Sequence, residues 1–257
     1  MLRSINAILG YKIAASDAEF GDVEDFYFDD WTWTVRYLVL DTGRWLPGRL
    51  VLLAPEVLGE PDWNRPVLPV SLTREQIENS PPVSAQAPVS RESEALLARY
   101  YGWATYWETD LVPENLRSSY AAEGTARGRR QLEGIVDSTL RSLEETEGYK
   151  AVGTDAKVGR VEDFIVETSN WIIRYAVVDT GRWLPGLTGK RVLLSPAWIS
   201  KVSWADREVR VDLTREAVEN SPEFDPSAPV NREVETRLFD YYGRPKYWEQ
   251  PAGAQQP

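Results

Sequence analysis

The sequence predicts a mainly β protein made of two small β-barrels in tandem, each followed by short helices. Two observations carry this prediction: one block of about a hundred positions occurs twice, and its segments are short, β-branched or aromatic, and separated by Gly, Asp and Pro. The chain has 257 residues, of which 42% are hydrophobic and 27% are charged, which fits two globular domains better than one.

The repeat is read from matched segments at a fixed spacing. Gly-Tyr-Lys at 10–12 returns at 148–150, and the eight residues Asp-Thr-Gly-Arg-Trp-Leu-Pro-Gly at 41–48 return unchanged at 179–186, both with an offset of 138. Three extra residues near 187–189 change the offset to 141, as in Tyr-Trp-Glu at 106–108 and 247–249. We therefore assign residues 1–108 to copy 1 and 140–250 to copy 2, with a partly helical linker at 109–139 and a disordered tail at 251–257.

Most segments within a copy are typical of strands, because they combine β-branched and aromatic residues. The predicted strands are 23–28, 35–40 and 50–53 in copy 1, and 161–166, 173–178, 192–194 and 209–213 in copy 2. Residues 209–213 alternate between apolar and charged side chains, so one face of that strand is expected to meet water. Short strands with this spacing favour a small barrel over one continuous sheet.

Helical signals come late in each copy. Thr73 and Gln76 have the spacing of a capping box, and Thr214 is the matching N-cap in copy 2. A second helix is predicted to begin after Ser90 or Asn231 and to end at a C-capping glycine. Between the copies, apolar residues recur at helical spacing over 132–143, which predicts an amphipathic helix that ends near residue 140.

Composition excludes several classes of site. The chain has no cysteine and no histidine, so disulfides, zinc–thiolate sites and every catalytic device that needs an imidazole are excluded. No cofactor and no metal are predicted. The net charge of −11 disfavours nucleic acid, and it is unevenly distributed: residues 1–108 carry 9 basic and 16 acidic side chains, whereas residues 148–257 carry 15 and 16. Without an apolar stretch of ~20 residues or a signal peptide, a soluble cytoplasmic protein is expected.

The matched segments resemble the PRC-barrel family. The resemblance lies in Leu-Arg-Ser, Gly-Tyr-Lys, the 21–26 stretch Gly-Asp-Val-Glu-Asp-Phe, the strand that ends at Asp41, and Leu-Thr-Arg-Glu before a proline, and it covers roughly residues 2–80 and 140–222. It implies a bacterial protein with a small β-barrel that contacts other proteins, as in the cytoplasmic part of the photosynthetic reaction-centre H subunit and the C-terminal half of a ribosome-maturation factor. Unlike the first of these, the chain is not expected to have an N-terminal membrane helix, and where relatives have Gly in the first hairpin it has Ala18 and Ala156.

The repeated eight-residue loop is the best candidate for an interaction site, because Arg and Trp are enriched among interface hot spots. The candidate residues are Asp41, Arg44, Trp45, Asp179, Arg182 and Trp183. The alternative interpretation, which turn chemistry favours, is a hairpin whose Asp caps the turn and whose Trp covers one end of a barrel. The paired tryptophans 33/171, 45/183, 63/204 and 107/248 are expected to fill cores and cover barrel ends. The acidic pairs at 24–25 and 162–163 point to opposite faces of a strand and cannot converge on one substrate.

These observations predict a non-enzymatic protein-interaction or scaffold protein whose two copies pair within the chain as a pseudo-dimer, with a protein partner of unknown identity. The first alternative is a small-molecule module that binds an anionic ligand through the Arg/Trp loops. A second alternative, implied by the resemblance alone, is a role associated with a reaction centre. A carboxylate hydrolase is the least favoured interpretation.

Overall fold

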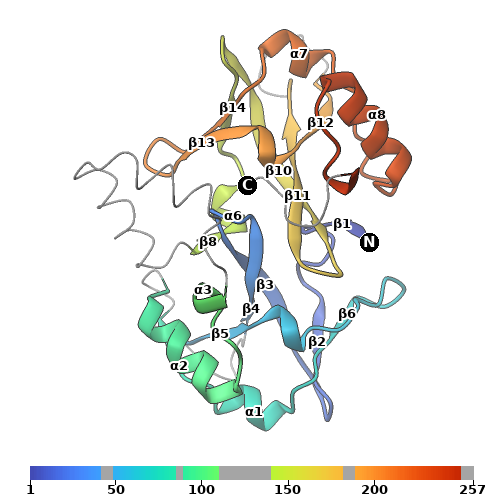
Figure 1. Ribbon diagram of the computed structural model, residues 1–257. Helices are drawn as coiled ribbons and strands as arrows, with labels where there is room; N and C mark the ends of the chain where they lie inside the picture. The colour runs from blue at the N-terminus through green and yellow to red at the C-terminus, as the bar shows by residue number, and fades with distance from the viewer. Residues whose placement is uncertain (42–48, 85–88, 110–139, 182–188, 250–257) are drawn as a thin grey trace, which may run out of the picture. The chain divides into compact units, whose positions relative to one another are not determined.

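The computed structural model describes residues 1–41, 49–84, 89–109, 140–181 and 189–249, and in them the protein is mainly β (Figure 1). The strands of copy 1 are β1 (Leu2–Ser4), β2 (Lys12–Ala14), β3 (Glu19–Asp29), β4 (Thr34–Asp41), β5 (Arg49–Leu53), β6 (Val67–Pro69) and β7 (Val83–Ser84). Those of copy 2 are β8 (Leu140–Ser142), β9 (Lys150–Val152), β10 (Lys157–Glu167), β11 (Ile172–Asp179), β12 (Arg191–Leu194), β13 (Ile199–Ser203) and β14 (Glu208–Val211). The predicted mainly β class is confirmed, and every predicted strand lies within one of these or overlaps it.

The chain divides into two compact units that do not follow the sequence repeat. Unit 1 contains residues 1–9, 25–36 and 141–257, and unit 2 contains residues 10–24 and 37–140. In unit 1 the strand order is β13-β14-β9-β10-β11, with β1 added to β10 and β12 added to β11. Two segments of copy 1 are therefore part of the compact unit that holds most of copy 2.

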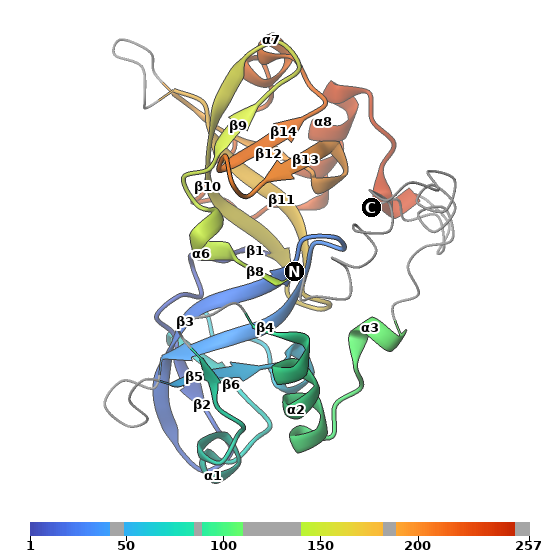
Figure 2. The same cartoon turned by 90° about the vertical axis from the view of Figure 1, so that its left-hand side faces the viewer.

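The two copies exchange their first strands. β1, from copy 1, runs antiparallel to β10 of copy 2, with Leu2 opposite Glu167 and Ser4 opposite Ile165 (Figure 2). Reciprocally, β8 at the start of copy 2 pairs with β3 of copy 1. The serine of each exchanged strand donates its hydroxyl to an aspartate of the other copy, Ser4 to Asp163 and Ser142 to Asp25, both at 2.5 Å. The two contacts use equivalent residues of the repeat, each a serine of Leu-Arg-Ser and an aspartate of Glu-Asp-Phe.

In unit 2 the strand order is β6-β2-β3-β4, with β5 on β4 and β7 on β5. β2 and β6 run parallel, whereas β2–β3, β4–β5 and β5–β7 are antiparallel pairs. The core of unit 2 consists of aliphatic side chains from alternate strand positions that are fully buried, among them Ile13, Leu38, Leu40, Leu52 and Leu68. Residues 37–40 form a continuous apolar run that is buried on both faces of the sheet.

The expected separation into two closed barrels is not confirmed. Within unit 1 the ladder passes from β11 to the start of β4 through one residue pair, Ile172 opposite Thr34, so the described strands form one large mixed sheet that does not close. Two hydrogen bonds make this junction: Ile173 donates its N–H to the carbonyl of Trp33 at 2.8 Å, and Val35 donates to the carbonyl of Trp171 at 2.9 Å. A sequence pattern shows which face of a strand is buried, but it does not show which strand lies beside it at the edge of a sheet. The pairing of β11 with β4 was therefore not predictable.

Trp33 and Trp171 have left-handed backbones, with φ of 51° and 56°. This conformation costs a non-glycine residue ~1–2 kcal/mol, and burial of the two rings offsets it. Trp33 lies 5.3 Å from Phe28 and Trp171 lies 5.6 Å from Phe26, measured between ring centroids. The prediction that Trp33 and Trp171 fill a core is confirmed.

The first hairpin of each copy, at Ala18 and at Ala156, does not require a positive φ at the alanine.

The helices are α1 (Arg74–Glu78), α2 (Arg91–Tyr101), α3 (Tyr106–Thr109), α6 (Leu143–Thr146), α7 (Arg215–Glu219) and α8 (Arg232–Tyr242), with short 3₁₀ turns at Pro55–Val57, Pro196–Trp198 and Tyr247–Glu249. The predicted caps are confirmed: Thr73 and Gln76 form a capping box, and α2 and α8 end at left-handed glycines. The helix predicted over 132–143 lies mostly outside the described residues. Where residues 140–142 are described they form β8, because they pair with β3.

No helix in the described part of the chain is long and apolar enough to cross a membrane. The longest helix of copy 2, α8, and the 3₁₀ turn after it contribute Phe239 and Tyr247 to the walls of a pocket in unit 1.

Candidate functional site

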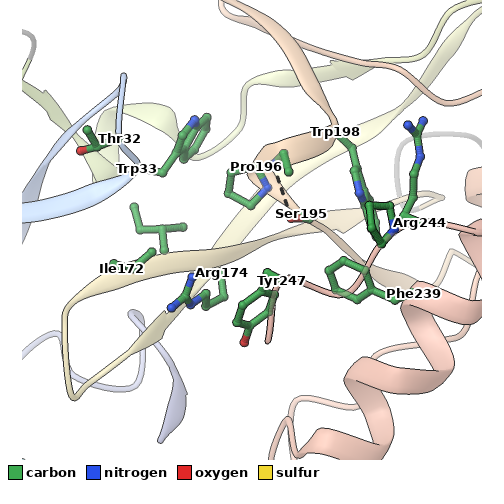
Figure 3. A pocket seen from close by; sticks show the side chains of 13 residues that line it. Thr32, Trp33, Ile172, Arg174, Ser195, Pro196, Trp198, Phe239, Arg244 and Tyr247 are labelled. Atoms are coloured by element: carbon green, nitrogen blue, oxygen red, sulfur yellow. Dashed lines mark hydrogen bonds between the residues drawn. The ribbon is translucent and has the colours of Figure 1, made fainter. Parts of the chain in front are cut away.

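A pocket of about 200 Å³ lies in unit 1, between β11, the turn before β13 and the end of α8 (Figure 3). Its walls are mainly aromatic and aliphatic, and arginines lie at its edge. The residues that define it are Trp33, Ile172, Arg174, Trp198, Phe239 and Tyr247. A cavity of this composition is suited to apolar groups.

Two walls of the pocket, Trp198 and Phe239, are positioned by a capped turn and by helix α8. Ser195 caps the 3₁₀ turn by accepting a hydrogen bond from the N–H of Ala197, and this turn directs Trp198 inward. Phe239 projects from α8 and meets Trp198 edge to face at 5.3 Å. Both rings are almost completely buried, so this wall is rigid.

The arginines of the pocket already have carboxylate partners. Arg174 donates two hydrogen bonds to one oxygen of Glu167, at 2.9 and 2.6 Å, and its guanidinium lies 4.4 Å from the ring centroid of Tyr247. Arg244 donates to Asp212, at 2.9 Å to the carbonyl and 3.1 Å to the carboxylate. Each guanidinium is therefore neutralised locally, and the pocket has little excess positive charge.

Behind Tyr247 lies a carboxylate that is almost completely removed from water. The side chain of Glu235 in α8 is 2% exposed, and it accepts hydrogen bonds from the hydroxyls of Tyr175 at 2.8 Å and Tyr247 at 2.7 Å. Arg232, one turn earlier in α8, forms an ion pair with it at 3.0 Å. Arg232 also lies 4.2 Å from the ring centroid of Trp248. We call these five residues the copy 2 latch, because they attach the tail at 247–248 to α8.

The same arrangement occurs in unit 2. Glu94 in α2 is fully buried, accepts a hydrogen bond from the hydroxyl of Tyr106 at 2.7 Å, and pairs with Arg91 at 3.0 Å. Arg91 lies 4.4 Å from the ring centroid of Trp107, and Tyr37 is the counterpart of Tyr175. We call this set the copy 1 latch. In both copies, therefore, the aromatic tail packs against the helix that precedes it.

Burial and the neighbouring carboxylate determine the protonation of the latch tyrosines. Burial, followed by the negative charge of Glu235, raises the pKa of Tyr175 and of Tyr247 far above the usual value. Burial and Glu94 do the same to the pKa of Tyr106. These phenols therefore remain neutral hydrogen-bond donors, a structural role rather than proton transfer at neutral pH.

The aromatic pocket depends on residues that differ between the copies. With the offset of 141, Trp198 corresponds to Val57, Phe239 to Ala98, and the exposed Ala197 to Glu56. The latch residues are shared, whereas the two bulky walls belong to copy 2 alone. The aromatic walls of the pocket, Trp198 and Phe239, are therefore not a product of the duplication alone.

Most of the predicted interaction residues, Arg44, Trp45, Arg182 and Trp183, lie outside the described residues. Asp41 is exposed at the end of β4. Asp179 accepts a hydrogen bond from the N–H of Gly181 at 3.0 Å, as the turn interpretation predicted.

The acidic pairs do not converge, as predicted. Glu162 forms a bidentate pair with Arg191, with both oxygen–nitrogen distances 2.6 Å, while Asp163 binds Ser4 of the exchanged strand. In copy 1, Asp25 is buried and receives Ser142, and burial raises its pKa to about 6. These two aspartates bind the serines of the exchanged strands.

Sequence reasoning missed both latches. The available signal was a matched set: Arg at the first helical position, Glu three residues later, and Tyr-Trp after the helix, all repeated at the offset of 141. Glutamate in the first turn of a helix is common on exposed surfaces, so its burial was not apparent.

Among the described residues no group of three or more acidic side chains could hold a metal ion.

Comparison with curated proteins gives no match. Comparison with protein-family models identifies one domain: residues 139–218, from the strand before β9 through α7, match the PRC-barrel domain.

Proposed function

We propose that this chain is a non-enzymatic protein-interaction module, and that its pocket receives one apolar side chain, aromatic or proline, from a partner protein. The observation that carries the proposal is the pocket itself: about 200 Å³, bounded by Trp198 and Phe239, and with both of its arginines paired.

The volume favours a side chain over a free metabolite. Pockets for small molecules usually measure ~300–1,000 Å³ and enclose most of the ligand. At about 200 Å³ this pocket has room for one ring or one proline but for little else. Protein interfaces commonly insert an aromatic anchor into such a pocket, while the rest of the contact lies outside it.

The charges disfavour the alternative of an anionic ligand here. Such a ligand would have to compete with Glu167 for Arg174 and with Asp212 for Arg244. Breaking an existing ion pair removes much of the gain from forming a new one.

The duplication supports a scaffold role. The matched latches and the reciprocal Ser–Asp contacts are the features of a homodimer whose subunits have been fused, and we propose that residues 2–80 form a second domain of the PRC-barrel type. A role associated with a reaction centre remains an expectation from the resemblance alone.

Photo-crosslinking in the native cell tests the proposal. A photoreactive phenylalanine analogue replaces Ala197, which is exposed at the mouth of the pocket. The expected result is one discrete protein adduct.

The matched control carries the analogue at Glu56, the equivalent exposed position of copy 1. Equal adducts at both positions, or none at position 197, would contradict the proposed site. A thermal-shift screen with apolar and anionic metabolites tests the small-molecule alternative, because a ligand of the native state raises the melting temperature.

A further inference from the structure

One face of the copy 2 sheet gathers positive charge. Directly opposite residues in a ladder lie on the same face, so the register defines that face. Arg160 and Glu208 are both opposite Lys150, while Lys157 and Arg210 are both opposite Val152. Lys201 is opposite Arg210. Five cations and one carboxylate therefore share one face of β10, β9, β14 and β13, a local net charge of 5 − 1 = +4 in a chain of net charge −11. We call it the basic face.

The basic face is exposed to solvent. Lys150, Arg160, Lys201 and Arg210 are all exposed, whereas Ala151 between the ladder positions is fully buried on the other side of the sheet. Figure 2 shows β9, β14 and β13 as adjacent strands. The pKa of Lys157 is lowered, first by burial and then by the charges of Arg160 and Lys150, so the cations act on one another.

Two of the directly opposite pairs have like charges, Arg160 with Lys150 and Lys201 with Arg210. Like charges at directly opposite positions destabilise a sheet. Copy 1 has the stabilising alternative: Lys12 is opposite Asp22, the equivalent of Arg160, and donates a hydrogen bond to it at 2.7 Å. The unfavourable arrangement in copy 2 is therefore not a requirement of the fold.

The two copies differ in charge at other positions of the basic face as well. Lys157, Arg160 and Lys201 of copy 2 correspond to three acidic residues of copy 1. These are Glu19, Asp22 and Glu60. In copy 1, Arg65 and Lys12 pair with Glu19 and Asp22. Copy 1 thus neutralises this surface, whereas copy 2 leaves an excess of positive charge on it, because its one carboxylate, Glu208, pairs among the described residues only with Arg210, at 3.4 Å.

We infer that the basic face binds an acidic segment of a partner protein, rich in Asp and Glu. This rests on the proposed function in that the occupant is a protein, and it adds a second surface, distinct from the pocket. Neighbouring strands lie ~4.8 Å apart, so the row from Lys157 to Lys201 spans ~14 Å, a length that a few carboxylates of one segment can match.

The rest of the molecule selects for a short acidic segment over a larger polyanion. Screening limits the field to ~8 Å at physiological salt, so a short segment meets only the local positive charge. Nucleic acid or an anionic membrane extends beyond the face and meets the remainder of the chain, which is acidic.

Fluorescence anisotropy with a labelled peptide of alternating Glu and Ser tests the inference on the full chain. The double variant Arg160→Asp, Lys201→Glu installs the residue types of copy 1 at the equivalent positions. We expect wild-type binding that weakens with added salt, and binding by the double variant that is weaker by at least about tenfold. The melting temperature of the variant should equal or exceed that of the wild type, because two like-charge pairs are removed.

The control with the same change in net charge is Lys12→Glu, Arg65→Glu on the equivalent surface of copy 1. It should bind the peptide as the wild type does; an equal loss would show an effect of net charge only and overturn the inference. Absence of peptide binding would overturn it too, as would stronger binding to phosphatidylglycerol vesicles or duplex DNA. If peptide binding persists while crosslinking at position 197 fails, the pocket is refuted and the basic face is not.

Discussion

The copy 2 latch makes a strong prediction about stability. Replacing Glu235 with Gln keeps the shape of the side chain and removes its charge. Gln can still accept hydrogen bonds from Tyr175 and Tyr247, but both become bonds between neutral groups. The change therefore isolates the contribution of the buried charge.

The magnitude is set by the two contacts. A hydrogen bond to a charged group contributes ~1.5–3 kcal/mol and a neutral one ~0.5–1.5 kcal/mol, so each tyrosine loses ~1–1.5 kcal/mol. Arg232 adds little, because its side chain is 54% exposed and its guanidinium regains water. Glu235→Gln should thus lower the free energy of unfolding by ~2–3 kcal/mol.

Urea unfolding followed by tryptophan fluorescence measures this loss. Glu233→Gln, an exposed change in the same helical turn, is the control and should cost less than about 1 kcal/mol. Glu94→Gln in the copy 1 latch should cost ~1–1.5 kcal/mol through its hydrogen bond from Tyr106. Tyr247→Phe combined with Glu235→Gln should cost less than the sum of the two single changes, because both act on the same Tyr247–Glu235 hydrogen bond, which the first removes and the second weakens. A loss below about 1 kcal/mol for Glu235→Gln, or full additivity, would refute the assignment of a charged, shared acceptor.

Three further predictions concern the exchange and the sheet. The pKa of Asp25 is about 6 in the folded protein against ~3.9 unfolded, so its protonation stabilises the fold below about pH 4 and this contribution is lost as the pH rises through 6; Asp25→Asn should flatten that part of a stability–pH curve. Ser142→Ala should cost ~1–3 kcal/mol in urea unfolding, because it leaves the buried carboxylate without its hydroxyl donor, and an unchanged midpoint would argue against the contact. Gly159→Ala should lower the melting temperature more than Gly148→Ala, because a Cβ at 159 would lie 2.3 Å from the backbone oxygen of Asp179, whereas one at 148 meets nothing within 4 Å and alanine there costs only the ~1–2 kcal/mol of a left-handed backbone at φ 78°; similar effects would contradict the packing of β10.

Much of the local structure was predictable because it is determined by neighbours in the sequence. The capping box at Thr73, the caps of α2 and α8, and the strand at 35–40 depend on spacing within about ten residues. The burial of Trp33 and Trp171 followed from their size and their recurrence. These features need no knowledge of tertiary contacts.

The exchange of strands was not predictable, because Leu-Arg-Ser at 2–4 and at 140–142 is identical. Either segment satisfies the same pattern of burial in either copy, so only the packed structure decides which one lies beside β10. The left-handed backbone conformation of Trp33 and Trp171 could not be predicted either, because the periodicity of apolar residues carries no information on the sign of φ. The latch glutamates were missed because burial of a first-turn carboxylate depends on tyrosines distant in the sequence.

The pairing of β1 with β10 has a consequence for synthesis of the chain. Ser4 leaves the ribosome about 160 residues before Ile165, the residue opposite it in the ladder. At ~5–20 residues per second this leaves β1 without its partner for ~8–30 s, long compared with the folding of a small domain. During that interval the nascent N-terminus is open to chaperones and to the same strand of neighbouring chains on a polysome.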